Sequence, residues 1–172
     1  INDVNMEKLA EIPIKPVRIA FDHWSLHEKY EKAVRTAVRH GHTSLSNYIL
    51  YNFEDKPIEL YWRLKLNVDL CEELGASIYS FPMKYHPIED PDYFSNRDYI
   101  GKYWNRKFIR TIQAVLNSTK GKVGKGHEFF CKAFGANEKE FYKLLYMPEV
   151  MIIHRFYFEK LGMTDCWWHD YN

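Results

Sequence analysis

The segment "SLSNYILYNFEDKPIELYWRLKLNVDLCEELGASIYSFPMKY", residues 44–85, decides the fold class. It contains an apolar, aromatic-rich run at 44–51 and another at 76–83, and such runs favour strands. Between them, Asp55 and Pro57 open a helix with an apolar stripe, and a glycine ends it. A strand, a helix and a strand with short connections predict a βαβ unit, whose two strands are parallel.

A similar unit precedes this segment. The run "PVRIAF" at 16–21 predicts a strand, and the capping-box pattern "SLHE" at 25–28 begins an amphipathic helix that Gly41 ends. Two successive βαβ units predict three adjacent parallel strands with their helices on one side. Such a sheet is too small to stand alone comfortably, so we expect part of a barrel or of a doubly wound sheet, with the other face turned to a barrel interior.

The pattern changes after residue 88. A linker rich in Pro, Asp and Asn at 86–99 predicts a boundary, with one region at 1–88 and a helical extension at 89–172. The basic stretch "KGKVGKG" at 120–126 is interpreted as a mobile turn that interrupts the helices. The predicted helices run from about 100 to the turn and then cover 127–134, 137–147, 148–161 and 163–170.

Composition limits the function classes. The net charge is +1, which argues against a dominant partner such as duplex DNA or an anionic membrane. The sequence contains no apolar run long enough to span a bilayer, and we expect no signal peptide. Cys71, Cys131 and Cys166 are too few and too far apart for a disulfide framework or a CxxC zinc site, and we expect a cytoplasmic protein.

Polar residues gather where the predicted strands end. In parallel α/β folds, ligands bind at the carboxyl ends of the strands, so these residues predict the lip of a cavity. For Asp22 and Asn52 the alternative is that each caps a helix or a turn. The residues concerned are Asp22, Ser46, Asn47, Asn52, Pro82 and Lys84.

Three further residue patterns give weaker indications of function. Two histidine pairs have spacings compatible with a metal, but no carboxylate pattern accompanies them, so solvated histidines are favoured. Cys71 falls on the apolar stripe of its helix, which favours a buried thiol. A basic stripe lies opposite an apolar one and is interpreted as a solvent face, although binding of RNA or DNA by it stays open. The histidines are His23, His27, His40 and His42, and the stripe comprises Lys102, Arg106 and Arg110.

Three segments together resemble the second half of the barrel of radical S-adenosylmethionine (SAM) enzymes. "RIAFD" is similar to the fourth strand of that superfamily, "LYNFEDKPIELYWRLKLNVDLCEELG" to the fifth strand and its helix, and "SFPMKYHPI" to the sixth strand. The resemblance covers residues 1 to about 88. It implies a partial (β/α)6 barrel whose strand ends hold SAM and a [4Fe-4S] cluster, and radical chemistry on an unknown substrate.

One feature of the superfamily does not occur in this chain. The cluster of the superfamily is held by three cysteines spaced CxxxCxxC, and the sequence has no such triplet. It also starts at Ile1 instead of methionine. We therefore expect a carboxyl-terminal portion of a longer enzyme, inactive by itself, whose partner is the amino-terminal half of its own barrel.

The resemblance also implies roles for individual residues. Asp22 would accept hydrogen bonds from the ribose or the amino group of SAM, and Lys84 would meet the carboxylate of SAM or the substrate. Ile49 and Pro82 would sandwich the adenine, with Ser46 and Asn47 beside them. The fifth-strand pattern GxIxGxxE, laid over residues 47–54, keeps Ile49 and Glu54 but loses both glycines.

Two other function classes stay open. The first is a noncatalytic module that binds RNA or a protein partner through its basic helix. The second is a complete small α/β enzyme, which would need a nucleophile and a base within these residues. The sequence offers no convincing pair of that kind.

Overall fold

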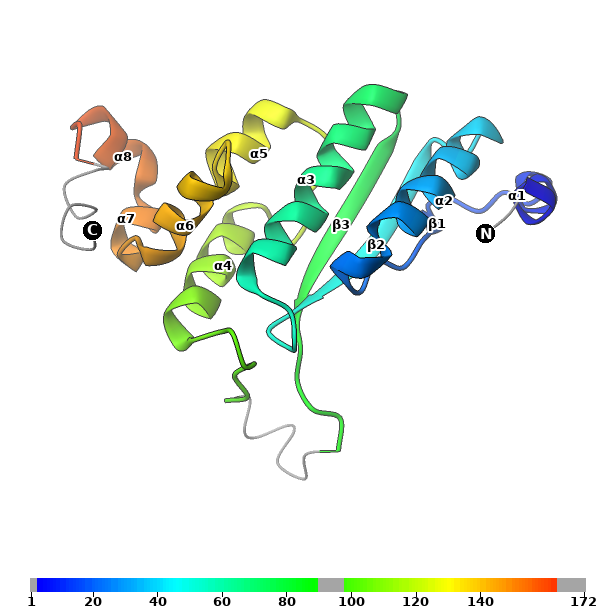
Figure 1. Cartoon of the computed structure of the whole chain (residues 1–172). Coiled ribbons are helices and arrows are strands. Elements are labelled where there is room, and N and C mark those ends of the chain that lie inside the picture. The colour runs from blue at the N-terminus through cyan, green and yellow to red at the C-terminus, as the bar shows by residue number, and fades with distance from the viewer. Residues whose placement is uncertain (1–2, 90–97, 164–172) are drawn as a thin grey trace.

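The computed structural model describes residues 3–89 and 98–163, and it has a mixed α/β fold (Figure 1). Its sheet has three parallel strands in the order β1 (Val17–Arg18), β2 (Ser44–Tyr51) and β3 (Ser77–Lys84). Leu45 stands in register with Val17 on one side and with Ile78 on the other. The predicted parallel arrangement of three adjacent strands is confirmed.

β1 is shorter than the predicted strand at 17–21. The Ile19 amide still donates to the Ser46 carbonyl, at 3.0 Å. Farther along, the carbonyls of Phe21 and Asp22 accept hydrogen bonds from the Arg63 side chain. The strand ends before these residues because their carbonyls accept hydrogen bonds from Arg63, which lies on the helix after β2.

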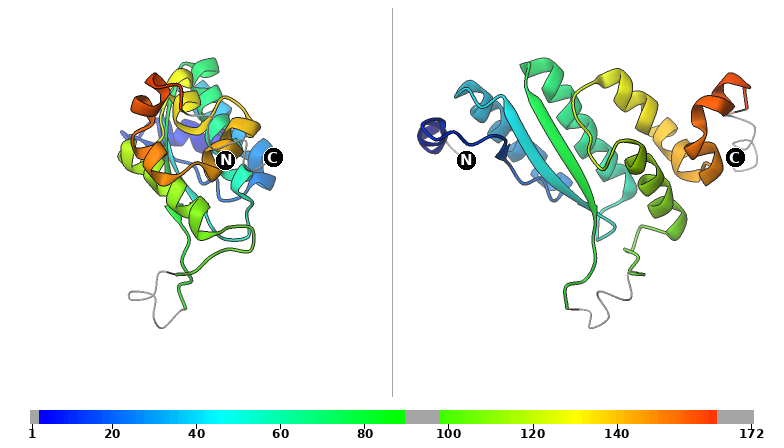
Figure 2. Two further views of the ribbon diagram at one scale, coloured as in Figure 1. Left: turned by 90° about the vertical axis from the view of Figure 1, so that its left-hand side faces the viewer. Right: turned by 180° about the vertical axis from the view of Figure 1, so that it is seen from behind.

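Two helices connect the strands and lie on the same side of the sheet. They are α2 (His27–Arg39), which follows a short 3-10 helix at Trp24–Leu26, and α3 (Pro57–Leu74). Seen from behind in Figure 2, β2 and β3 lie in front of these helices. A further helix, α1 (Asp3–Ala10), precedes β1 and packs against α2.

The helix starts differ in detail from the predicted caps. The N-cap of α3 is Lys56, whose amide donates to the Glu59 carboxylate at 2.6 Å. The "SLHE" pattern forms no capping box, because Ser25 lies inside the 3-10 helix and α2 begins after Leu26 without a side-chain cap. The C-cap of α3 is Gly75 at φ 63°, as its position after the apolar stripe predicts.

The regular elements that the structure describes after β3 are all helices. α4 (Arg106–Ser118) starts later than predicted, because the Asn105 side chain accepts from the Phe108 amide and caps the helix there. The helix predicted at 148–161 is two helices that meet at His154. The remaining helices are α5 (His127–Phe134), α6 (Glu138–Tyr146), α7 (Glu149–Ile153) and α8 (Arg155–Lys160). The helix predicted at 163–170 lies almost entirely outside the described residues.

Both regions of the chain share one core. Buried side chains of β2 and α3, such as Ile49 and Leu64, belong to the same cluster as Ile112 of α4 and Phe141 of α6. A second cluster joins β1, α1 and α2. The helical extension therefore packs directly against the βαβ region.

The basic stretch at 120–126 is fixed at its centre. Val123 is buried, and it exchanges two backbone hydrogen bonds with Ser80 of β3, at 2.7 and 2.8 Å. The interpretation of this stretch as a mobile turn is corrected, because Val123 pairs with the outer edge of β3. No helix among the described residues has the length and apolar character needed to cross a membrane.

No helix among the described residues covers the second face of the sheet. We call it the open face, and the opposite face the covered face. The open face carries two exposed aliphatic side chains, Leu50 and Met83, and an aromatic pair whose ring centroids are 5.7 Å apart. Its residues on β2 and β3 are Ser46, Tyr48, Leu50, Tyr79, Phe81 and Met83.

Candidate functional site

Asn52 ties together the segments at the carboxyl edge of the sheet. It follows β2, is fully buried and has a φ of 70°, a region that asparagine enters more readily than most residues. Its Nδ2 donates to the carbonyls of Tyr85 and Tyr99, and its Oδ1 accepts from the Gly101 amide at 2.9 Å. The end of β3 and the approach to α4 are thereby attached to the end of β2.

The contact at Gly101 leaves no room for a side chain. A Cβ atom on this residue would lie 2.3 Å from the Phe53 carbonyl oxygen. The glycine is needed for close approach of two backbones, and the turn after β2 is held firmly against the segment that leads to α4.

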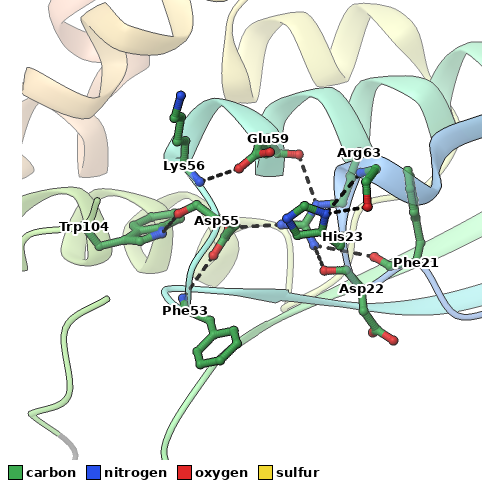
Figure 3. Close-up of polar contacts among 10 residues, drawn as sticks. Phe21, Asp22, His23, Phe53, Asp55, Lys56, Glu59, Arg63 and Trp104 are labelled. Carbon is green, nitrogen blue, oxygen red and sulfur yellow. Dashed lines mark hydrogen bonds and ion pairs between the residues drawn. The ribbon is translucent and has the colours of Figure 1, made fainter. Parts of the chain in front are cut away.

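A buried ion pair lies beside this turn (Figure 3). Arg63 Nη2 is 3.1 Å from Asp55 Oδ2, and both side chains are almost completely buried. The Phe53 amide also donates to the Asp55 carboxylate, and Trp104 Nε1 donates to the Asp55 carbonyl at 2.8 Å. Burial raises the pKa of Asp55, while the Phe53 amide and Arg63 favour its charged form.

Arg63 extends the same network to the end of β1. Its Nη1 donates to the Asp22 carbonyl at 2.9 Å and approaches the Phe21 carbonyl at 3.5 Å, and its Nε donates to the Glu59 carbonyl. One buried guanidinium thus fixes the backbone after β1 to α3 and to the turn after β2. Five donors in a rigid fork suit this role.

The Asp22 carboxylate points away from this network. Figure 3 shows its oxygens directed to the opposite side from Arg63. The residue is exposed, and among the described residues its carboxylate has no hydrogen bond or ion pair. The Asp22 carboxylate can therefore accept hydrogen bonds from a ligand, while Arg63 holds the Asp22 backbone in place. Sequence reasoning found Asp22 and missed Arg63, whose position on a long helix gives no sign of burial.

The structure separates the other predicted site residues by face. Asn47 and Ile49 point to the covered face, where Ile49 is fully buried, and Pro82 and Lys84 share that face by register. Ser46 points to the open face, because successive side chains alternate along a strand. The six residues therefore do not line one side of a single pocket. Contact of any of them with a cofactor stays a prediction.

Asn47 belongs to a buried polar cluster. Its Nδ2 donates to the Tyr30 hydroxyl at 2.7 Å, and in the neighbouring strand Ser80 Oγ accepts from Asn67 Nδ2 at the same distance. Burial raises the pKa of Tyr30, which keeps this hydroxyl protonated. These contacts join α2, α3 and the sheet, and they give Asn47 a structural role.

The described cysteines occupy different environments. The prediction of a buried thiol at Cys71 is confirmed: its Sγ accepts from the Ile78 amide at 3.2 Å, and burial raises its pKa. Cys131 is partly buried and lies 3.6 Å from His127 Nδ1 on the same helix. Cys166 lies outside the described residues.

The histidines of the two pairs make hydrogen bonds within the protein, and His42 contacts the Met6 carbonyl at 3.3 Å. His23 and His27 bond to Ser25 and to the Trp24 carbonyl, and His40 contacts Asp3. Within residues 3–89 and 98–163, no group of three or more His, Cys, Asp or Glu side chains is arranged to hold a metal ion.

The predicted basic stripe is solvent-exposed, as expected, but it does not lie on one helix. Lys102 precedes α4 and places its Nζ 5.2 Å from the centre of the Tyr103 ring, whereas Arg106 and Arg110 are on the helix.

Comparison of the chain with protein-family models, with curated proteins and with solved structures finds no match.

Proposed function

We propose that this chain contributes three strands to a parallel (β/α) barrel and that the open face is turned to the barrel interior. The observation that supports this most is the arrangement of the sheet. Its strands follow one another in sequence order, and their connecting helices lie on one side. In a barrel, every crossover places its helix outside, and the inner face is filled by side chains and ligands.

We further propose that the barrel binds SAM and cleaves it reductively, as the resemblance to radical SAM enzymes implies. The described residues do not fit the [4Fe-4S] cluster. Cys71 is buried against Ile78, and Cys131 lies on another helix. The chain's own part is to line the SAM pocket, and the cluster would be held by the remainder of the parent protein.

Asp22 is the residue through which the chain would act on SAM. Its carboxylate is available at the carboxyl end of β1, and Arg63 fixes its carbonyl at 2.9 Å. A carboxylate held in this way suits the ribose hydroxyls or the ammonium group of SAM, because hydrogen bonds to a charged acceptor are stronger than neutral ones. Ile49 does not take part in this proposal, since it lies in the core.

The test uses the full-length parent protein. SAM affinity is measured by calorimetry, and 5'-deoxyadenosine formation is measured under anaerobic reducing conditions, for the wild type, Asp22→Ala and Asp22→Asn. Glu28→Ala, another exposed carboxylate that lies on α2, is the matched control. We expect Asp22→Ala to weaken SAM binding about ten- to a hundredfold, with a smaller loss in Asp22→Asn.

Two results would count against the proposal. If the parent protein bound no SAM, the radical SAM assignment would fail. If it bound SAM equally well with Asp22→Ala and with Glu28→Ala, the assignment would stand and the role of Asp22 would be rejected.

A further inference from the structure

A second candidate site lies in the helical region, away from the sheet. A hollow of about 650 Å³ is lined by residues of α4, α5, α6, α7 and α8, which Figure 1 shows grouped at the carboxyl-terminal end of the molecule. This volume is within the range of small-molecule sites. It is separate from the carboxyl edge of the sheet where Asp22 lies.

The walls of the hollow differ in character. α4 contributes Arg110, Gln113 and Asn117, which recur at helical spacing and form a polar wall. The facing helices contribute Phe129 and Ile152, among other apolar side chains. A ligand in this space would meet polar groups along one side and an apolar surface along the other.

The charges of the lining are mostly neutralised by neighbours. Lys132 pairs with Glu128 at 2.7 Å, and Arg155 pairs with Glu159 at 2.8 Å. Two lining charges of opposite sign have no ion pair within the part of the chain that the structure describes, namely Arg110 and Glu149.

Both charges line the hollow where α4 and the segment that leads into α7 are joined. Lys107 Nζ donates to the Met147 carbonyl and Thr111 Oγ1 donates to the Leu145 carbonyl, both at 3.3 Å. These bonds fix the segment before α7 alongside the first turns of α4. Arg110 lies between the two donors in sequence, and Glu149 is the first residue of α7.

We propose that this hollow binds a small molecule with an α-amino-acid head group and a bulky apolar body. Its carboxylate would meet Arg110, its ammonium group would meet Glu149, and its body would lie against Phe129 and Ile152. An α-amino acid carries charges of opposite sign, which matches one cation and one anion that line the same hollow and have no ion pair among the described residues. The proposal does not depend on the proposed function.

The probe for the test is ε-dansyl-L-lysine, whose fluorescence rises in an apolar environment. Titration of the 172-residue chain is expected to give saturable binding. Two matched probes each lack one head-group charge: the α-N-acetyl derivative and the α-carboxamide. Each is expected to bind about five- to tenfold more weakly, because partly exposed charged contacts contribute less than buried ones.

Variants assign each charge to its residue. Arg110→Gln should weaken the intact probe and leave the carboxamide unaffected, whereas Glu149→Gln should weaken the intact probe and leave the acetylated one unaffected. Arg106→Gln is the matched control, since it makes the same charge change on α4 but pairs with Asp98 and does not line the hollow. Ala114→Trp should fill the space and abolish binding, with a melting curve to check folding.

The outcomes are decisive in both directions. Loss of affinity that follows the head-group charges and the two variants supports the proposal. Absence of saturable binding overturns it. So does equal binding of all three probes to the wild type and to Arg110→Gln, because that result would mean adsorption of the dansyl group alone.

Discussion

The two faces of the sheet differ sharply over neighbouring residues of the same strand. Ile49 is 0% exposed on the covered face, whereas Leu50 is 36% exposed on the open face. Both faces of β2 and β3 carry apolar and aromatic side chains, a composition typical of parallel strands that are buried on both sides. The comparison indicates that both faces have the composition of buried surfaces, although helices among the described residues bury only one of them.

The two faces also differ in the hydrogen bonding of their polar groups. On the covered side, Asn47 and Asn67 donate to other buried side chains, and Arg63 satisfies several backbone carbonyls. The open face has no network of this kind among the described residues; there Arg18 lies over the Tyr48 ring, with 5.7 Å from Cζ to the ring centre. The covered side is thus packed as a protein interior. Mutations there should lower the free energy of unfolding more than mutations on the open face.

The largest expected effect concerns Arg63 in the covered layer. Arg63→Met leaves the buried Asp55 carboxylate without its partner and should lower the free energy of unfolding by about 3 to 5 kcal/mol in urea titrations. Arg35→Met is the control, because Arg35 pairs with Glu31 and Glu73 but is 38% exposed, and it should lose about 1 kcal/mol or less. Equal losses in the two variants would contradict the comparison. If Arg63→Met does not fold, the double variant with Asp55→Asn should recover folding.

The second largest effect is the difference in stability loss between truncations on the covered face and on the open face. Ile49→Ala should lower the free energy of unfolding by about 2 to 5 kcal/mol, since it opens a cavity in a packed core. Leu50→Ala should lower it by about 1 kcal/mol or less, since the side chain is already partly in water. Denaturant titrations of both variants measure the difference. Similar losses would show that the open face is covered in solution.

A smaller effect should appear at alkaline pH. Burial raises the pKa of Tyr51 to about 12, from 10.0 in an exposed phenol. The native state therefore keeps this proton where the unfolded state loses it, so the contribution to stability is complete below pH 10 and is lost as pH rises towards 12. Tyr51→Phe should make the fall in unfolding free energy between pH 10 and 12 less steep. An unchanged slope would show that this phenol ionises in the native state.

The smallest effect is expected for a charge placed on the open face. Met83 is 48% exposed, so Met83→Lys in the 172-residue chain should change the free energy of unfolding by no more than about 0.5 kcal/mol. Thermal and urea denaturation measure it, with sedimentation to record the oligomeric state. A loss above about 2 kcal/mol would mean that the lysine is buried in the folded protein, and a simultaneous loss of dimer would identify the cover as a second copy.

Local patterns predicted most of the secondary structure. The strand prediction at 44–51 matches β2, and the helix prediction at 127–134 matches α5. Boundaries failed where a specific side-chain contact set them. Asn105 starts α4 later than its apolar stripe suggests, and the Arg63 network ends β1 after Arg18. Such contacts depend on which side chain meets which backbone group, and periodicity does not encode this.

The candidate site was predictable only in part. Asp22 was predicted because polar residues at strand ends mark the carboxyl edge of a parallel sheet, and its role in a site stays a prediction. Ser46 and Asn47 lie on opposite faces of the sheet, because adjacent residues of a strand alternate in direction, and nothing in an apolar run states which face is covered.

The sequence by itself determined the parallel order of the strands and the side of the connecting helices. Hydrophobic periodicity, turn residues and crossover handedness are local properties, and together they leave few topologies. Only the tertiary structure decided that Arg63 is buried, since its bonds reach 41 residues back to Asp22 and 8 back to Asp55. An arginine on a helix is compatible with either solvent or an interior. Its place was settled by the carbonyls and the carboxylate that folding brings to it, because a buried charge is stable only where such partners converge.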